Sequence, residues 1–474
     1  MLKRGTETEL SLERLAFGGH AVGHHEGMVV LVRGGVPGDS VRVRIVKAKR
    51  KHAEAEIVEV IRPSSLRAES RCMHFGVCGG CKWQHISYDA QLQTKQQHVA
   101  DAFERIGNFR SLPIAPIIGS EETYFYRNKI EFSFSRQRWL TADEIVDKGV
   151  SVKEFGLGFH TPQRYDKVVN IKKCWLLSES SNGILNTVRE FCRERQLSIY
   201  STKTHDGFLR HLVIRQSKRT DETMVNIVTS DDDPGLMREL CRVLLSEFPQ
   251  ITTIVNNITA RKSMVAFGEK ENVYFGPGYI TERMGGFTFR ISANSFFQTN
   301  TPQAERLYEV VRSLGNLSPK DDVFDLYCGT GTIAIYISNH VAEVAGIDVV
   351  AEAIEDAKLN AALNSVRNCR FVLGDLKDKL TKDTSWISRN PDVVILDPPR
   401  SGLHPKVAQQ VAALNPSRIV YASCNPTTQA RDVRIFADLG YELRGLQPLD
   451  MFPHTYHVEN VALIERTSPR ASDP

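Results

Sequence analysis

The sequence of 474 residues lacks the segments that would place it in or across a membrane. No uninterrupted apolar stretch approaches the roughly 20 residues that a membrane-spanning helix needs. The first residues, MLKRGTETEL, contain no apolar run followed by a small-residue cleavage site, the pattern of a secretory signal peptide. We therefore expect a cytoplasmic protein with no membrane partner, and nothing in the sequence indicates an obligate protein partner.

A strong excess of one charge is also missing. The 60 Lys and Arg residues nearly balance the 56 Asp and Glu residues, which leaves a net charge of +4. This total alone gives weak support for a polyanionic partner, so the distribution of charge matters more. The stretch 33–51 carries seven basic residues and one acidic residue. It is either a solvated strand surface or a surface that contacts phosphates.

The length allows two to four domains, and three kinds of pattern follow one another along the chain. Residues 1–62 hold short β-rich runs separated by glycine-rich turns, which predicts a small five-stranded, OB-like β-barrel. Residues 63–290 mix strand-like and helical runs, interrupted by a charged insertion at about 137–155, and predict a central α+β domain. Residues 291–474 alternate strands with helices, which predicts a doubly wound, Rossmann-like α/β domain. The predicted fold class is therefore multi-domain α/β.

The run VFDLYCGTGTIAIYI has the pattern of a buried strand, a glycine-rich turn and the start of a helix. Gly329 and Gly331 lack a Cβ atom and would let the backbone approach a ligand closely. About twenty residues further on, a second strand ends in Asp348, where a carboxylate suits a ribose diol. The pattern alone fits either a dinucleotide or S-adenosylmethionine.

Two later strands favour S-adenosylmethionine. Asp375 follows the run FVLG, where a carboxylate could hold an adenine amino group. An Asp-Pro-Pro turn begins at Asp397 and follows a further strand. Ligands of open α/β sheets bind beyond such strand ends, and this turn is typical of a methyltransferase rather than a dehydrogenase.

Cys424 follows the next strand, in the run RIVYASCNP. A lone cysteine at a strand end is usually a small buried hydrophobe, but this strand should lie beside the Asp-Pro-Pro strand. A thiolate there would serve uracil chemistry, because C5 of uracil becomes nucleophilic only after addition at C6. Glu459 begins the last strand and is the candidate base for the C5 proton. The alternative for Glu459 is an exposed side chain with no catalytic role.

Three of the nine cysteines, Cys72, Cys78 and Cys81, lie close together in the sequence. Disulfides are not expected in the cytoplasm, so clustered cysteines indicate metal ligands or catalytic groups. Thiolates at this spacing suit either a [4Fe–4S] cluster or zinc. The five residues between the first two exceed the usual gap of zinc loops, which favours iron, and a fourth ligand must come from elsewhere.

Several of these runs resemble known families. The run LAFGGHAVGHHEGMVVLVRGGVPGDSVRVRI resembles the TRAM domain, an RNA-binding barrel, which favours RNA contact for the basic stretch. The runs NSFFQTN, DLYCGTGTIAI, LDPPRSGL, SCNP and HVE resemble the RNA (uracil-5-)-methyltransferase family, over essentially the whole chain. This resemblance implies methylation of uridine in RNA with S-adenosylmethionine as the methyl donor. The contacts to S-adenosylmethionine that it implies are Gln298, Tyr327, Thr332, Asp348, Asp375 and Asp397.

The resemblance also implies roles for other residues. Cys424 matches the nucleophile, Glu459 the proton acceptor and Phe296 an aromatic side chain that stacks on the flipped uracil. The branch of the family with a TRAM domain carries a [4Fe–4S] cluster, and the resemblance implies Cys174 as its fourth ligand. Members with both features mostly modify 23S rRNA. We therefore expect 23S rRNA as the substrate, with a tRNA T-loop as the alternative.

Three other classes share single features with this chain. A methyltransferase for exocyclic amines would use an Asp-Pro-Pro edge but no nucleophilic cysteine. A radical sulfur-inserting enzyme would use C-x3-C-x2-C spacing, which differs from the spacing of Cys72, Cys78 and Cys81. A non-enzymatic RNA-binding or ribosome-assembly factor would have no use for Cys424 together with Glu459. These differences favour uridine C5 methylation.

Overall fold

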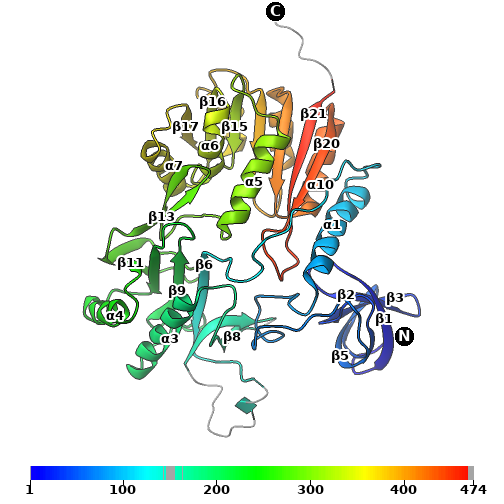
Figure 1. Ribbon diagram of the computed structural model, residues 1–474, viewed down its shortest axis with the longest axis vertical. Coiled ribbons are helices and arrows are strands. Elements are labelled where there is room, and N and C mark those ends of the chain that lie inside the picture. Colours follow the sequence, from blue (N-terminus) through cyan, green and yellow to red (C-terminus); the bar gives the residue numbers. More distant parts are fainter. Residues whose placement is uncertain (1, 142–143, 146–154, 163, 468–474) are drawn as a thin grey trace, which may run out of the picture.

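The computed structural model describes residues 2–141, 144–145, 155–162 and 164–467, so most of the insertion expected at 137–155 lies outside the described residues. Its strands form a closed barrel, two seven-stranded sheets and a two-stranded hairpin. The barrel and the central sheet lie below the C-terminal sheet in Figure 1. Within the described residues, no helix has the length and apolar character needed to span a bilayer.

The N-terminal barrel closes in the strand order β1-β2-β3-β5-β4. Its strands are β1 (Glu7–Leu15), β2 (Ala21–His25), β3 (Met28–Arg33), β4 (Ser40–Ala48) and β5 (His52–Arg62). Alternate side chains such as Val30 and Val32, and Val41 and Val43, are buried in the barrel, as the two-residue period of a strand requires. The five-stranded barrel expected from the sequence is confirmed.

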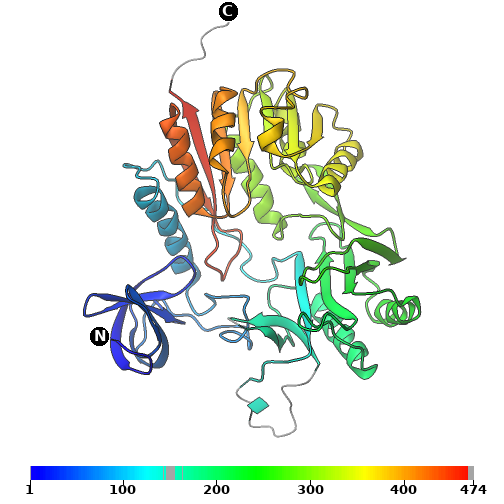
Figure 2. The same ribbon diagram turned by 180° about the vertical axis from the view of Figure 1, so that it is seen from behind.

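Helix α1 (Tyr88–Arg105) joins the barrel to the C-terminal part of the chain. It packs against α10 (Pro426–Asp438) and β20 (Tyr441–Leu449). On the barrel side, the ring of His98 makes a hydrogen bond of 3.0 Å with the carbonyl of Leu15. The helix therefore fixes where the barrel sits relative to the C-terminal sheet, as Figure 2 also shows. The domain boundaries at 62 and 290 stay predictions.

The central sheet has the order β12-β11-β10-β9-β6-β7-β8, and α3 and α4 pack together on it. Their apolar faces cover a buried core that includes Ile184, Val188 and Leu244. The bounds are β6 (Lys129–Ser135), β7 (Gly156–Thr161), β8 (Arg164–Asn170), α3 (Glu179–Glu194), β9 (Leu209–Gln216), β10 (Thr223–Thr229), α4 (Pro234–Glu247), β11 (Ile251–Ile258) and β12 (Lys270–Phe275).

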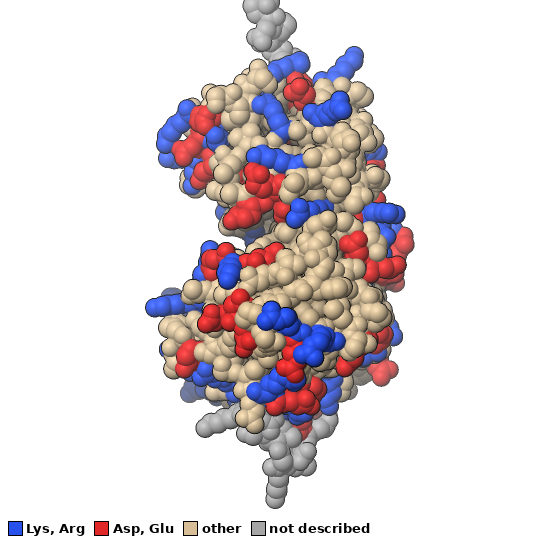
Figure 3. All heavy atoms as spheres, turned by 90° about the vertical axis from the view of Figure 1, so that its left-hand side faces the viewer, with Lys and Arg blue, Asp and Glu red and all other residues tan. Residues whose placement is uncertain are grey.

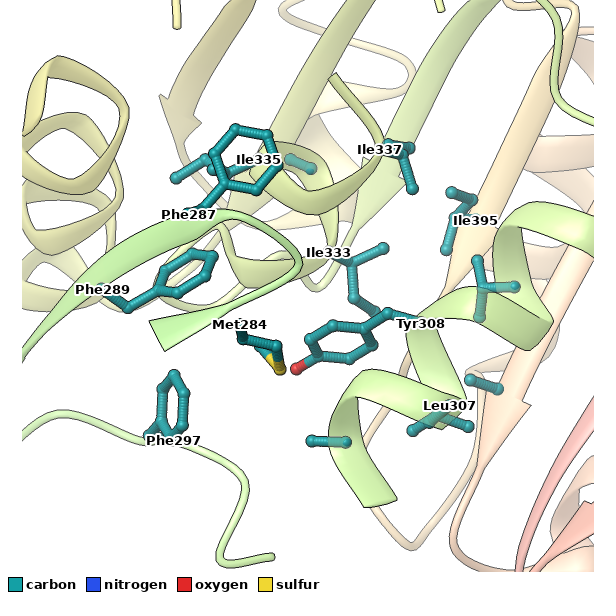
Figure 4. Packing of buried hydrophobic residues seen from close by; sticks show 14 of the residues in the cluster. Met284, Phe287, Phe289, Phe297, Leu307, Tyr308, Ile333, Ile335, Ile337 and Ile395 are labelled. Atoms are coloured by element: carbon teal, nitrogen blue, oxygen red, sulfur yellow. The ribbon is translucent and has the colours of Figure 1, made fainter. Parts of the chain in front are cut away.

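The hairpin of β13 (Tyr279–Met284) and β14 (Phe287–Ser292) connects the central sheet to the C-terminal one. Its buried side chains join the core beneath α5 (Thr301–Leu314) and α6 (Thr332–Ile337). Figure 4 shows Met284 beside Tyr308, with the ring of Phe297 directed toward that of Phe289. The segment that leads into the C-terminal sheet is therefore held firmly by apolar packing.

The C-terminal sheet has the order β17-β16-β15-β18-β19-β21-β20. Successive residues of β18 enter different cores: Val393 and Ile395 join one, and Val394 and Leu396 join the other. Both faces of the sheet are thus covered, which confirms the predicted doubly wound α/β domain. Its remaining elements are β15 (Asp322–Leu326), η1 (Ser338–His340), β16 (Glu343–Asp348), α7 (Ala351–Leu363), β17 (Cys369–Leu373), α8 (Leu376–Lys379), β18 (Val393–Leu396), α9 (Pro405–Ala413), β19 (Arg418–Ser423) and β21 (Glu459–Arg466).

Candidate active site

Several of the residues singled out in the sequence follow the carboxyl ends of neighbouring parallel strands. In the register of the sheet, Leu326 of β15 pairs with Leu396 of β18, and Leu396 pairs with Tyr421 of β19. The strand ends therefore meet at one edge, where open α/β sheets bind ligands. The residues placed at this edge are Tyr327, Asp348, Asp375, Asp397 and Cys424.

Three of these residues line one cavity of about 430 Å³. They are Tyr327, Asp348 and Asp375, and the opposite wall comes from the segment 399–405 that follows the Asp-Pro-Pro turn. The Asp348 carboxylate is held in place by the backbone N–H groups of Gly329, at 3.0 Å, and Val350, at 2.9 Å. A cavity of this size suits a nucleoside-sized ligand.

The two glycines of the turn differ in what surrounds them. Gly329 has φ of 52°, and a Cβ atom there would meet nothing within 4 Å, so its backbone is open to a ligand. A Cβ on Gly331 would lie 2.8 Å from the ring of Phe371. Gly331 therefore permits close packing of α6 on β17, whereas the sequence assigned ligand approach to both glycines.

Other residues expected at the cofactor lie outside that cavity. Gln298 is half-buried, and its backbone carbonyl accepts a hydrogen bond of 2.9 Å from the Asn128 side chain. The Thr332 hydroxyl lies 3.0 Å from the hydroxyl of Tyr308. Phe296 is 67% exposed, which leaves its ring free to stack on a base.

Cys424 and Glu459 are brought together by the antiparallel pairing of β19 with β21. Ser423 pairs with Asn460, so the next position places Cys424 opposite Glu459. Side chains at directly opposite positions of an antiparallel pair are close neighbours. The sequence separates these two residues by a helix and a strand, and the fold returns them to one edge.

The charges around this pair are unusual. Burial raises the pKa of Glu459 to about 8, and the nearby Asp397 carboxylate acts in the same direction. Burial and the Glu459 charge raise the pKa of the Cys424 thiol to about 11. The Arg400 guanidinium opposes both shifts, and it does so at Cys424 by its charge and by a hydrogen bond.

Two residues of this site were not identified from the sequence. Burial and the charge of Asp397 raise the pKa of Asp325 to about 8. Arg400 directly follows the Asp-Pro-Pro turn. Both lie within or beside runs that were recognised, Asp325 in VFDLYC and Arg400 in DPPR. A charged residue inside an apolar strand was the available signal for Asp325, since such a group is rarely buried without a role.

A second cavity, of about 250 Å³, is lined by all four cysteines that were expected to bind a metal. We call it the cysteine cavity, and its cysteines are Cys72, Cys78, Cys81 and Cys174. Burial raises the pKa of Cys78 and of Cys174 to about 12, and the neighbouring thiols add to the rise. No group of three or more His, Cys, Asp or Glu side chains in the described ranges is gathered closely enough to hold a metal ion.

The loop 450–458 connects the two sites. Thr455, Tyr456 and His457 line the cysteine cavity, and Glu459 begins the strand that follows. The loop is anchored by Asp450, which is fully buried and receives a hydrogen bond of 2.5 Å from the buried ammonium of Lys95 on α1. A buried ion pair of this kind fixes geometry, because removing either partner leaves an uncompensated charge.

The basic stretch of the barrel is largely paired with acidic residues. Arg42 lies between Glu59, at 2.7 Å, and Glu9, at 3.4 Å. Arg44 pairs with Glu7 at 2.8 Å. Because of these ion pairs, the local excess of positive charge in the sequence is much reduced on the folded barrel. Figure 3 shows a different face of the molecule, on which basic and acidic side chains are also interspersed.

Comparison with known proteins agrees with this architecture. A family described as tRNA (Uracil-5-)-methyltransferase matches residues 250–467, and the TRAM domain matches residues 2–58. A protein of Chlorobaculum tepidum described as an uncharacterized RNA methyltransferase is 46% identical over 93% of this chain and 92% of its own length. A protein of Bacteroides thetaiotaomicron with the same description is 43% identical over 95% of this chain and 100% of its own length.

One solved structure is similar over nearly the whole chain. It is the tRNA (uracil-54, C5)-methyltransferase of Pyrococcus abyssi in complex with S-adenosyl-L-homocysteine, with a TM-score of 0.74 and 31% identity. The similarity covers 96% of this chain and 100% of that one. The chain therefore belongs to the S-adenosylmethionine-dependent RNA (uracil-5-)-methyltransferases and carries an N-terminal TRAM domain.

Proposed function

We propose that this chain forms 5-methyluridine in RNA by covalent catalysis from Cys424. The observation that carries the proposal is the placement of Cys424 opposite Glu459, at a strand edge that also holds Asp397 and Arg400. This edge adjoins a cavity lined by Tyr327 and Asp348. A thiol, a carboxylate and a cofactor cavity are the groups that C5 methylation of uracil requires.

The reaction begins at the Cys424 thiol. Arg400 donates a hydrogen bond to its sulfur and favours the thiolate, and the thiol proton leaves to solvent. The thiolate adds to C6 of uracil, and the electron pair of the C5–C6 double bond becomes available at C5. S-adenosylmethionine supplies an electrophilic sulfonium methyl group. C5 takes this methyl group, while the C–S bond of the sulfonium breaks.

Glu459 then resolves the covalent adduct. Its carboxylate accepts the C5 proton, the C5–C6 double bond re-forms and the C6–S bond breaks, which returns the thiolate. A pKa of about 8 makes Glu459 a stronger base than an ordinary carboxylate. Because Arg400 acts on both Cys424 and Glu459, it stabilises the anionic form of whichever group carries the charge.

The remaining assignments follow from where the residues lie. Asp348, Asp375 and Tyr327 line the cavity that would take the adenosine part of the cofactor. Asp397 follows β18 beside Cys424 and would lie near the methyl group. The exposed ring of Phe296 would stack on the flipped target uracil. Cofactor contacts from Gln298 and Thr332 rest on their match to the family motifs.

We further propose a [4Fe–4S] cluster in the cysteine cavity. The four thiols are soft donors that line one cavity of about 250 Å³, and four thiolates are the usual ligand set of a [4Fe–4S] cluster. The gap of five residues between Cys72 and Cys78 is longer than in zinc loops, which favours iron. When bound, such a cluster would tie the segment 72–81 to Cys174 and to the loop 450–458.

For the substrate we propose 23S rRNA. The combination of a TRAM domain with the cysteine set supports it, because this combination is expected mostly in enzymes that modify 23S rRNA. A second candidate is the tRNA T-loop, favoured by the similarity to a structure described as a tRNA (uracil-54, C5)-methyltransferase. Base choice depends on RNA shape, which single residues of the protein do not encode.

The test uses purified protein with labelled S-adenosylmethionine and two unmodified RNAs, a 23S rRNA transcript and a tRNA transcript. We expect 5-methyluridine in nuclease digests of the 23S rRNA reaction. The same reaction on RNA containing 5-fluorouridine should leave a protein–RNA adduct, because fluorine cannot leave C5 as a proton does. Label in a nucleoside other than 5-methyluridine would refute the reaction, and label in tRNA alone would refute the rRNA assignment.

A further inference from the structure

A cluster of cationic and aromatic side chains adjoins the cysteine cavity, which two of its members line. We call it the cation–aromatic cluster, and its members are Arg71, Tyr124, Phe125, Lys173 and Trp175. They come from three segments: the connection between β5 and α1, the one between α1 and β6, and the one between β8 and α3. The first of these segments lies between the barrel and the central sheet in Figures 1 and 2.

The centre of the cluster is the exposed guanidinium of Arg71. Its carbon lies 3.7 Å from the centre of the Trp175 ring, 5.3 Å from that of Tyr124 and 5.5 Å from that of Phe125. The Lys173 ammonium lies 4.1 Å from the centre of the same Trp175 ring. Three aromatic rings thus surround one guanidinium group of an exposed residue.

The backbone beneath the cluster is tightly held. Phe125 has φ of 57°, in the left-handed region that a bulky side chain rarely adopts. Its N–H donates to the carbonyl of Trp175 at 2.8 Å, and its own carbonyl accepts from the Lys218 ammonium. The ring of His454, a residue with φ of 65°, packs against that of Tyr124 with ring centres 4.4 Å apart. The cluster is therefore pre-organised by an unfavourable backbone geometry that the surroundings enforce.

The central cation of the cluster also differs from those of the barrel. Arg42 and Arg44 of β4 pair with strand glutamates, and within the cluster Lys173 pairs with the exposed Glu179 at 2.6 Å. Across the described residues, no carboxylate forms an ion pair with Arg71. An exposed guanidinium without an acidic partner, held among aromatic rings, is the pattern of a surface for single-stranded nucleic acid.

The position of the cluster relates it to the proposed catalytic residues. Lys173 and Trp175 line the cysteine cavity together with Tyr456 and His457. His457 is two residues from Glu459 in the sequence. Burial and the charge of nearby Arg400 both lower the pKa of its imidazole. A chain of nucleotides that leaves the proposed uracil site along this wall would reach Lys173 and Trp175, and Arg71 lies on the ring of Trp175.

We propose that the cation–aromatic cluster binds a single-stranded nucleotide of the RNA substrate beside the target uridine. One base stacks on the Arg71 plane, and the neighbouring phosphate contacts Lys173. Stacking of this kind tolerates any base, so the cluster holds the unpaired strand without reading its sequence. The proposal rests on the proposed function in taking RNA as the ligand, and it adds where the strand is held.

The experiment measures binding of a fluorescein-labelled single-stranded RNA by the full-length protein, at several salt concentrations. We expect Arg71→Ala to weaken binding about ten-fold, the loss of roughly one stacked base. Arg71→Lys keeps the positive charge but removes the planar group. Its RNA binding should show the salt dependence of the wild type, but its affinity should stay as low as that of Arg71→Ala. An RNA duplex of the same sequence cannot stack a base on Arg71, so its affinity should fall less in either variant.

The matched control is Arg195→Ala. Arg195 also lies 3.7 Å from the centre of an aromatic ring, that of Phe191, but it follows α3 and is paired with Glu239. We expect no change in RNA affinity from this substitution, and unaltered thermal unfolding and S-adenosylhomocysteine binding for all three variants. Wild-type affinity in Arg71→Ala would overturn the proposal. So would a loss confined to protein-containing ribosomal particles, which would indicate a protein partner.

The two proposals fail separately. If the wild-type protein transfers no methyl group to C5 of uridine but Arg71→Ala still weakens RNA binding, the proposed reaction is wrong and the RNA site stands. If the wild type methylates uridine and Arg71→Ala leaves the RNA affinity unchanged, the RNA site is wrong and the reaction stands.

Discussion

Cys424 and the cysteines of the cysteine cavity are all partly buried, but their neighbours differ. Burial raises the pKa of Cys424 to about 11 and that of Cys78 and Cys174 to about 12. At Cys424 the neighbours are a cation, Arg400, and a carboxylate, Glu459. In the cysteine cavity the thiols of Cys78 and Cys174 lie beside other thiols. Cys424 is therefore suited to gain and lose a bond repeatedly, whereas the cavity thiols become thiolates most readily by binding a metal.

The two groups are nonetheless close through the loop 450–458. One part of this loop lines the cysteine cavity, and its last residue precedes Glu459. Lys95 and Asp450 anchor the start of the loop on α1. On the proposed function, the same residue type has opposite purposes at the two ends of the loop: reversible chemistry at Cys424 and permanent ligation in the cysteine cavity. Substitutions at the two ends should therefore have different effects.

The largest effect is expected from Cys424→Ala. Without the thiolate, C5 of uracil is not activated, so methyl transfer should fall on the order of 10⁴-fold or more. Binding of S-adenosylhomocysteine should change little, because Cys424 does not line the cofactor cavity. Calorimetry and methyl incorporation measure the two properties. The control is Cys369→Ala, which changes a half-buried thiol of β17 in the same sheet. Residual methylation near the wild-type rate would contradict covalent catalysis.

The next effect is expected from Glu459→Gln, which keeps the side-chain shape but cannot accept the C5 proton. Turnover should fall by about 10²- to 10⁴-fold, the usual loss of a general base. Methylated RNA should remain bonded to Cys424 and migrate as a slow band in denaturing gels. The double variant with Cys424→Ala should lose this band. Normal turnover with no adduct would assign the proton to another group, such as His457.

A smaller effect is expected from pH. The proton on Glu459 is retained up to about pH 8, because burial raises its pKa, and only the carboxylate can act as the base. Release of methylated RNA from the adduct should therefore speed up about ten-fold per pH unit below 8 and level off above it. Single-turnover experiments on isolated adduct measure this rate. A release rate that does not change between pH 6 and pH 8 would contradict the role of Glu459.

Much of this architecture could be predicted from local patterns. The barrel, the doubly wound sheet and the strand-end positions of Asp348, Asp397 and Cys424 follow from runs of a few residues each. Such runs carry both the period of the strand and the residue that ends it. The opposite placement of Cys424 and Glu459 depends on how β21 pairs with β19, and no short run encodes that pairing.

The sequence could not show which side chains from distant segments become neighbours in the fold. The basic stretch 33–51 has one acidic residue within it, but β1 and β5 bring Glu7, Glu9 and Glu59 against it. Conversely, Arg71 and Trp175 are about a hundred residues apart, and only the fold makes them neighbours. A charge count along the sequence thus overstated one surface and missed another.

The smallest effect on methylation is expected from replacing a cysteine of the cysteine cavity. Cys174→Ser should remove iron and the brown colour of the protein, because a hydroxyl is a poor ligand for a cluster. Methylation should weaken but persist, since Cys424, Arg400 and Glu459 are untouched and only the support of the loop 450–458 is lost. Cys424→Ala should show the reverse, full colour and no methylation.

Iron analysis, the visible spectrum and methyl incorporation are measured on protein purified without oxygen. The control is Cys192→Ser, which alters a buried thiol of α3 in the same core but outside the cavity. It should keep both iron and activity. Stoichiometric zinc without iron in the wild type would show that the cavity holds a different metal. Loss of methylation in Cys174→Ser as complete as in Cys424→Ala would show that the two groups of cysteines do not serve separate purposes, because the chemistry at Cys424 would then depend entirely on the cavity.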